Sequence, residues 1–190
     1  ISGTAEGGYP VQANLSIRKP NLVQNGSFEQ TDRSMWKITY GDGLSPHTDY
    51  QNKASDAKTG QYSLHFFDVN EVNFRVEQDV YGLKPGYYDL SMNIQGGNAN
   101  NSDMKLYAKT GGQTLEQPTN VNGWVQWSQP VIHDVYVADG SLTVGAVVRA
   151  DGGAWGTLDD FYLTFVRGVD SAPTPEPTPT PEPTPVPVPN

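Results

Sequence analysis

The sequence contains no cysteine, and this absence excludes several classes of site at once. Disulfide frameworks, thiolate zinc clusters and catalytic thiols all need cysteine side chains. The absence is compatible with secretion without establishing it, because a domain with a large core needs no disulfide to hold it together. The compartment must therefore be inferred from other features.

Long apolar runs and basic clusters are missing too. No run approaches the roughly 18 apolar residues that a membrane-spanning helix needs. The opening ISGTAEGGYP lacks the basic start and apolar stretch of a signal peptide, so we expect the chain to be an internal part of a processed protein. Lys and Arg number 12 against 21 Asp and Glu, which gives a net charge of −9. Such a surface repels polyanions, and we expect neither a nucleic-acid nor a membrane partner.

The end of the chain has a different composition from the rest. From Pro173 it reads PTPEPTPTPEPTPVPVPN, which cannot bury apolar surface and favours an extended polyproline II helix. We predict a disordered Pro/Thr/Glu-rich linker over 169–190. Such spacers join modules in secreted polysaccharide-degrading enzymes, and a disordered end or a cloning remnant is the alternative interpretation.

Glycine and proline interrupt the remainder at short intervals, with alternating apolar and polar residues between them. This pattern, rich in Val, Tyr, Phe and Thr, is typical of β-strands, and no long amphipathic helix competes with it. The sequence therefore predicts an all-β domain. The clearest strands are 73–80, 87–95, 105–110, 125–128, 131–137, 141–149 and 161–166.

The turns between these strands indicate how they pair. LKPG at 83–86 and ADG at 138–140 have the residues of tight reversals, which favours antiparallel neighbours and a sandwich of two sheets. Along 87–95, every second residue is apolar and should face the core. We expect the sandwich to span 21–168. Residues 1–20, with a possible strand VQANLSI, form a leading strand or the end of a preceding domain.

Four motifs carry a family resemblance. They are NLVQNGSFE from Asn21, KTGQYSLHF from Lys58, LKPGYYDLSM from Leu83 and WGTLDDFYL from Trp155. Together they resemble carbohydrate-binding modules with the galactose-binding-like jelly-roll fold over about 21–167. The run is most similar to family 61, the β-1,4-galactan-binding modules of endo-β-1,4-galactanases. The resemblance implies a secreted, noncatalytic, monomeric module covalently linked to a catalytic domain, with polysaccharide as its partner. Modules for xylan, β-glucan or other galactosides are alternatives within the fold.

The resemblance also implies a structural calcium ion, with Glu29 and Asp160 at the matching positions. Two acidic residues brought together from distant sequence repel each other unless a cation lies between them, and calcium prefers six to eight oxygen ligands. Ser27 and Lys58 are our candidates for backbone carbonyl donors. Asp159 and Asp160 could also be a solvated turn or a glycosidase pair. Neighbours on a strand point to opposite faces, however, so this pair should not flank one substrate.

Sugar recognition needs an aromatic plane together with polar groups that bind hydroxyls. Trp155, in the glycine-rich loop ADGGAWG, is the strongest aromatic candidate, although it could simply pack on the sandwich edge. Trp36 should be in the core. Trp124 and Trp127 should face opposite ways, one of them inward.

We expect Arg75, Asn93 and Gln95 to cluster if their strands are neighbours. The other candidates are Asn73, Asn98 and Arg149 at strand ends and Tyr40 and His47 in the 36–50 segment.

Three functions remain open from the sequence. The first is a polysaccharide-binding module, which the exposed tryptophan loop, the linker and the resemblance favour. The second is a β-sandwich polysaccharide hydrolase or lyase, which would need convergent carboxylates or a Tyr/His/Arg set in one cleft. The third is a structural or adhesive spacer domain of a surface protein, which would bind no glycan.

Overall fold

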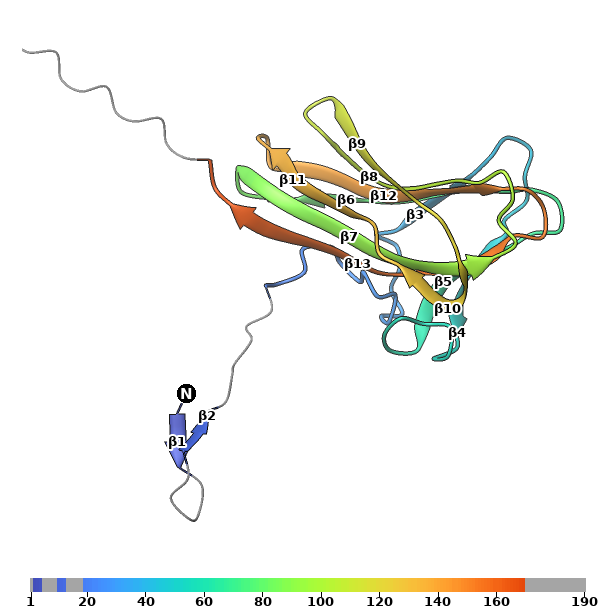
Figure 1. Cartoon of the computed structure of the whole chain (residues 1–190). Coiled ribbons are helices and arrows are strands. Elements are labelled where there is room, and N and C mark those ends of the chain that lie inside the picture. The colour runs from blue at the N-terminus through green and yellow to red at the C-terminus, as the bar shows by residue number, and fades with distance from the viewer. Residues whose placement is uncertain (1, 5–9, 13–18, 170–190) are drawn as a thin grey trace, which may run out of the picture.

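The computed structural model describes residues 2–4, 10–12 and 19–169 of the chain. Every regular element in these ranges is a strand, and two antiparallel sheets pack face to face as a sandwich (Figure 1). This confirms the predicted fold class. The predicted linker, apart from Val169, and residues 13–17 of the possible strand VQANLSI lie outside the described residues. Ser2–Thr4 (β1) and Pro10–Gln12 (β2) pair with each other as a two-stranded ribbon.

The sandwich is made of a five-stranded and a six-stranded sheet. The five-stranded sheet has the order β3-β6-β12-β8-β9, and the other has the order β10-β7-β13-β5-β4 with β11 also paired to β7. The strands are Lys37–Tyr40 (β3), Thr48–Asn52 (β4), Tyr62–Phe67 (β5), Val72–Tyr81 (β6), Gly86–Gly97 (β7), Asp103–Thr110 (β8), Gln113–Thr119 (β9), Gly123–Ser128 (β10), Val131–Val137 (β11), Ser141–Ala150 (β12) and Trp155–Arg167 (β13).

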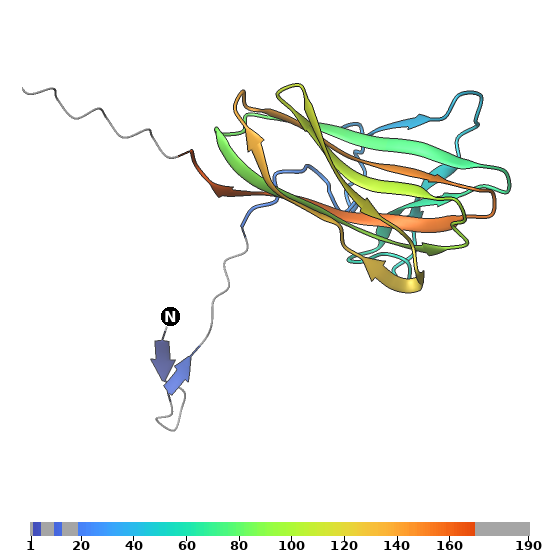
Figure 2. The same ribbon diagram turned by 45° about the horizontal axis from the view of Figure 1, so that its top comes forward.

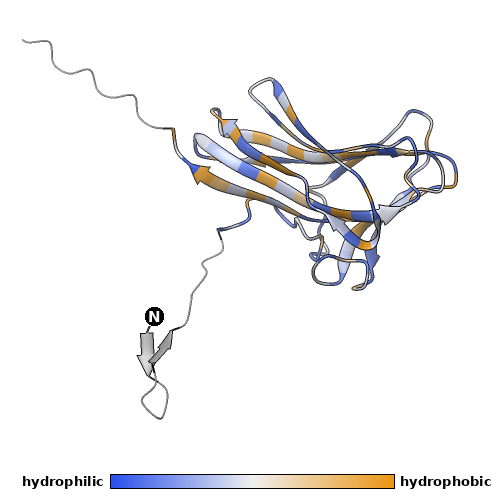
Figure 3. Ribbon diagram, in the orientation of Figure 1, coloured by the Kyte–Doolittle hydropathy of each residue, from blue (hydrophilic) through white to orange (hydrophobic). Residues whose placement is uncertain are grey.

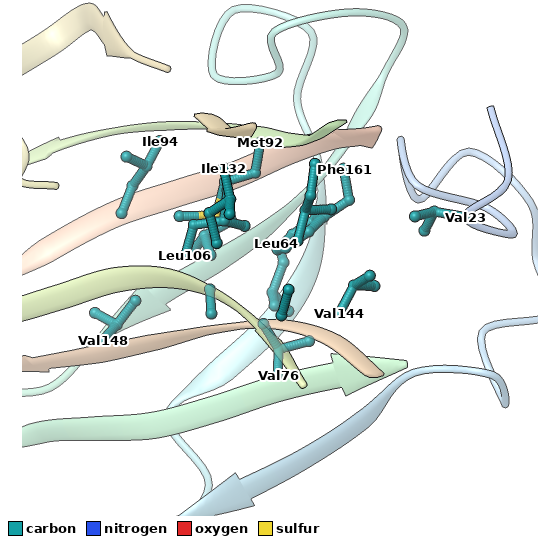
Figure 4. Packing of buried hydrophobic residues seen from close by; sticks show 14 of the residues in the cluster. Val23, Leu64, Val76, Met92, Ile94, Leu106, Ile132, Val144, Val148 and Phe161 are labelled. Atoms are coloured by element: carbon teal, nitrogen blue, oxygen red, sulfur yellow. The ribbon is translucent and has the colours of Figure 1, made fainter. Parts of the chain in front are cut away.

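The core lies between the two sheets and follows the predicted alternation. Inward residues of β7 such as Leu90, Met92 and Ile94 are completely buried. Figure 4 shows Met92 and Ile94 facing Val76 and Val148 of the other sheet. Figure 3 shows the same alternation of apolar and polar positions along the strands. Burial of these side chains is the main force that holds the sheets together.

The two predicted turns do reverse the chain, but between sheets rather than within one. The turn after β6 leads into β7, and the turn after β11 leads into β12, so each joins a strand of one sheet to a strand of the other. The two turns lie side by side, because the Leu83 amide donates to the Gly140 carbonyl at 3.1 Å. Turn chemistry predicted the reversals but not the change of sheet, which depends on contacts distant in sequence. Figure 2 shows the two layers from another angle.

Within the sandwich, the sequence missed four strands, and it placed the start of β13 too late. β3, β4, β5 and β9 are short or polar, and β9 includes Pro118, which a sheet tolerates there because β9 is an edge strand. β13 starts at Trp155 rather than at 161. No helix within the described ranges is long and apolar enough to cross a bilayer.

The segment before β3 is fixed by an aromatic cluster. The rings of Phe28, Trp36 and Phe161 pack together, with 4.9 Å between the centroids of Trp36 and Phe161. The Trp36 indole also donates to the Asn25 carbonyl at 3.1 Å. This confirms Trp36 as a core residue. The aromatic cluster also fixes the NGSFE loop against β13.

Candidate functional site: an aromatic surface, a polar groove and a polar cleft

Trp155 is the first residue of β13, not a loop residue as predicted. It pairs with Phe67 of β5 on one side and Gly97 of β7 on the other. A Cβ added to Gly97 would lie 3.0 Å from Cζ2 of Trp155, so the indole packs directly against this glycine. Phe67 is 46% exposed beside it. The outer face of the six-stranded sheet thus has two neighbouring rings.

Trp124 and Trp127 lie on β10, which pairs with β7 in the same sheet. The prediction that one of them is buried is wrong, because Trp124 is 57% exposed and Trp127 is partly exposed. The cause is an irregular strand: the β10–β7 register shifts between Gly123 and Ser128, and Val125 adopts a φ of 59°. We name Phe67, Trp124, Trp127 and Trp155 the aromatic surface.

Buried polar side chains hold this surface in place. The Gln95 amide donates to the Thr157 hydroxyl at 2.9 Å, and its oxygen accepts the Val125 amide proton at 2.8 Å. Thr157 in turn donates to the Asp56 carbonyl at 2.8 Å. Gln95 therefore positions β10 and is not available to a ligand, contrary to expectation.

Asp56 fixes the orientation of Trp124. The Trp124 indole N–H donates to the Asp56 carboxylate at 3.1 Å, and Lys53 Nζ donates to its other oxygen at 2.8 Å. Burial alone would raise the pKa of Asp56, but the hydrogen bonds from Lys53, Trp124 and Ser55 outweigh it and hold that pKa below its ordinary value. The charged acceptor keeps the ring in one orientation, which reduces the entropy that a stacking ligand has to overcome.

The outer face of the five-stranded sheet is different in character. Arg75 and Val147 line two adjoining hollows of about 210 and 200 Å³. Tyr107 forms the floor: its ring covers Gly145, and its hydroxyl donates to Glu77 at 2.6 Å. Burial and that carboxylate raise the pKa of Tyr107 well above its ordinary value. We name this hollowed face the polar groove. Its other charged residues are Asp103, Lys105, Lys109 and Glu116.

The predicted cluster of Arg75 with Asn93 and Gln95 is wrong. Arg75 belongs to β6 of the five-stranded sheet, whereas the two amides belong to β7 of the other sheet. The groove instead brings Arg75 together with Asn73 and Tyr40.

Three other predicted sugar-binding residues lie apart from both surfaces or are already engaged. His47 is buried and accepts the Asn73 amide proton on Nε2 at 3.1 Å, so its role is structural. Arg149 donates to Glu71 at 3.2 Å and lines a separate hollow with Asp151. Asn98 occupies a turn position with a φ of 56°.

All four predicted calcium ligands line one cleft of about 700 Å³ on the outer face of the six-stranded sheet. Ser27 and Glu29 come from the NGSFE loop, Lys58 from the loop before β5, and Asp160 from β13. Glu29 accepts the amide protons of Gln61 and Tyr62 at 2.8 and 2.7 Å. We name this hollow the polar cleft. Its other walls include Ser91, Asn93, Gln129 and Tyr162.

Asp159 and Asp160 do not point to opposite faces, contrary to the sequence prediction. The register of β13 with β7 shifts after Asp159, and Asp160 adopts a φ of 49°. Both carboxylates consequently meet one loop: Lys58 N donates to Asp159 at 2.7 Å, and Thr59 Oγ1 donates to Asp160 at 2.8 Å. Asp159 is 0% exposed, and burial followed by the Asp160 charge raises its pKa to about 7. It cannot reach a substrate, so the pair does not form a glycosidase site.

A scan against protein-family models and a search of curated proteins gave no match. Among solved structures, the module TmCBM61 in complex with β-1,4-galactotriose is 26% identical, with a TM-score of 0.69 over 77% of this chain and 99% of that one. The chain resembles the family 61 carbohydrate-binding modules.

Two more distant structures share the fold of the module. A domain of the bacteriophage CBA120 tailspike protein 4 is 13% identical over 77% of this chain and 21% of that one, with a TM-score of 0.57. The family 22 module and hydrolase of a Clostridium thermocellum xylanase, in complex with xylohexaose, is 11% identical over 83% of this chain and 30% of that one, with a TM-score of 0.56. At these identities the likenesses show the sandwich fold alone.

Proposed function

We propose that the chain is a noncatalytic carbohydrate-binding module that binds β-1,4-galactan, or other galactose-containing side chains of pectin, through the aromatic surface. The observation that carries the proposal is that three tryptophans lie on strands of one sheet, with Trp124 57% exposed and hydrogen-bonded to Asp56. Exposed tryptophans fixed in this way have few structural roles. They are suited to stack on the apolar face of a pyranose.

Galactose suits this surface for a stereochemical reason. Its axial O4 leaves a continuous C–H patch on one side of the ring, which stacks on an indole, while its hydroxyls need directed polar groups. Asp56 with Lys53, and His65 with Asp49 at 2.7 Å, are polar pairs on the same sheet face or its covering loop. The 26% identity to a module solved with β-1,4-galactotriose supports this choice over xylan.

A hydrolase or lyase is less well supported. Within the described residues, the paired carboxylates of β13 are tied to the 58–59 loop, and one of them is fully buried. We therefore propose that the chain serves an attached catalytic domain by holding it on plant cell-wall polysaccharide. Secretion, a monomeric state and a tether through the Pro-Thr segment are part of the same proposal.

We also propose a structural calcium ion in the polar cleft. Glu29 and Asp160 would supply carboxylate oxygens, and Ser27 and Lys58 would supply backbone carbonyls. The described residues contain no group of three His, Cys, Asp or Glu side chains around a common point, so carbonyls or water must complete a shell of six to eight oxygens. The donor set fits the ion: both carboxylates face the loop between Lys58 and Tyr62, and a bound cation would offset the repulsion between Asp159 and Asp160.

Affinity electrophoresis in soluble galactan tests the proposed function. We expect galactan to retard the wild-type protein, and Trp155→Ala to abolish the retardation without changing the melting temperature by more than a few degrees. Tyr81→Ala, which removes a 73% exposed ring on the other sheet, is the matched control. A wild-type protein that no galactan, xylan or β-glucan retards would support the spacer interpretation instead.

A further inference from the structure

The polar cleft is larger than a metal ion requires. Its volume of about 700 Å³ lies within the range of ligand-binding pockets. The calcium candidates are only part of the lining. The other lining residues include Ser91 and Asn93 of β7, Gln129 between β10 and β11, and Tyr162 of β13.

Asn93 is the most informative residue of this second part. It is only 5% exposed, yet its side-chain amide makes no hydrogen bond within the described part of the chain. Its amide atoms are not fully enclosed by protein, so they are open to the cleft that the residue lines. The side chains of Ser91 and Gln129 are also without protein partners among the described residues. These groups are therefore available to a molecule in the cleft.

The chemistry of the walls indicates what kind of molecule this is. Amides and a hydroxyl can donate to and accept from hydroxyl groups, and the Tyr162 ring supplies an apolar plane. Apart from the proposed calcium ligands and Lys58, the lining residues are uncharged, which favours a neutral molecule. Lys58 joins the cleft to the aromatic surface, because it lines the former while its ammonium group lies 5.6 Å from the Trp127 ring centroid.

We propose that the polar cleft is a second subsite that binds a further neutral sugar residue of the same polysaccharide chain. This inference rests on the proposed function, since it extends the aromatic surface past Trp127. A short oligosaccharide occupies the rings alone, and a longer one also enters the cleft. The affinity therefore rises with chain length.

Isothermal titration calorimetry with β-1,4-galactotriose and β-1,4-galactohexaose tests this subsite. In the double variant Asn93→Ala/Gln129→Ala, we expect the affinity for the hexaose to fall about three- to tenfold, the effect of one or two lost hydrogen bonds, with no change for the triose. The fold should survive, because neither side chain bonds to the described protein. Gln113→Ala, an exposed amide on β9, is the control.

The outcomes separate the two proposals. If Trp155→Ala leaves the binding of both sugars unchanged, the proposed sugar-binding surface is wrong. If Trp155→Ala weakens both but the Asn93/Gln129 variant binds the hexaose as the wild type does, the cleft holds only metal and water and the inference fails. Tighter binding of an oligogalacturonate than of the galactohexaose would overturn the assignment to a neutral sugar.

Discussion

The two outer faces of the sandwich differ in whether their side chains already have partners. In the polar groove, Glu77 accepts from Tyr107 and lies 3.4 Å from Lys109, and Lys105 lies 3.2 Å from Glu116. On the opposite sheet, Trp124 is held by Asp56 and Trp155 packs against Gly97, while Trp124 and Phe67 remain exposed. Groups that satisfy one another gain little from a new ligand, whereas exposed rings do gain. The comparison therefore favours the aromatic surface as the sugar-binding face.

The groove contains one exception that makes this comparison worth testing. Arg75 forms no ion pair in the described part of the chain and lies 5.8 Å from the Tyr107 ring centroid. It is the group there that could best bind vicinal hydroxyls. The predictions below compare the two faces, beginning with the largest expected effect.

Removal of calcium by a chelator should have the largest effect, and it should act on the aromatic surface. The proposed calcium lies beside loop 53–62, which also carries Asp56. Calcium at a hundred times its Kd stabilises the fold by about 2.7 kcal/mol through mass action. We therefore expect EDTA to lower the Tm by several degrees and to weaken galactan binding. Scanning calorimetry with and without added calcium measures the first effect, and no shift in Tm would remove the calcium proposal.

The pH dependence of stability should report on Asp159, which accepts a hydrogen bond from the same loop. The pKa of Asp159 is raised to about 7, so in the absence of calcium the folded state binds more protons than the unfolded state between pH 4 and 7. The free energy of unfolding should thus fall as the pH rises through this window. In Asp159→Asn this part of the slope should vanish, which urea denaturation of both proteins in EDTA can measure. Equal slopes would contradict the raised pKa.

Removal of one side chain from each face should show which face binds galactan. Trp124→Ala should lower the affinity for galactan about tenfold, since a stacked ring contributes roughly 1 kcal/mol and the Asp56 contact is lost as well. Arg75→Ala should leave the affinity unchanged. Calorimetric titration of both variants decides between the faces, and the reverse result would move the sugar to the groove.

Changes beneath a ring should give smaller effects. A Cβ on Gly97 would lie 3.0 Å from Trp155, so Gly97→Ala should displace the indole and weaken binding about threefold. Gly97 has no positive φ, so alanine adds no backbone strain at this position. A crystal structure of the variant would show the ring displacement.

The smallest effect should come from the floor of the groove. Tyr107→Phe removes the hydroxyl that donates to Glu77 and should cost about 1 kcal/mol of unfolding free energy. Galactan affinity should not change. A loss of affinity in this variant, with the fold intact, would show that the groove takes part in binding.

The sequence predicted the sandwich and its core because alternation and turn chemistry are local signals. It located the inward face of β7 and the burial of Trp36. It did not predict that Arg75 and Gln95 lie in different sheets, since both turns cross between the layers. The prediction that the metal candidates lie together came from the family resemblance and not from a local sequence pattern.

The remaining site residues were missed for a physical reason. Trp124 is exposed because β10 is irregular around Val125, and the direction of Asp160 depends on the shift in β13. Alternation assumes a regular strand and fails at a bulge. Phe67 lies on β5, a strand that the sequence did not predict, and its place beside Trp155 appears only once β5 and β13 are paired.

Strand β13 begins with Trp155 at the proposed sugar surface and ends at Arg167, where the chain leaves the sandwich. At a rise of about 3.3 Å per residue, its 13 residues extend roughly 40 Å. Near that far end, Lys19 donates to the Phe165 carbonyl at 3.0 Å, so the incoming and outgoing chain adjoin. The strand thus places Trp155 at the opposite end of the sandwich from Lys19 and Arg167, where the described chain enters and leaves it.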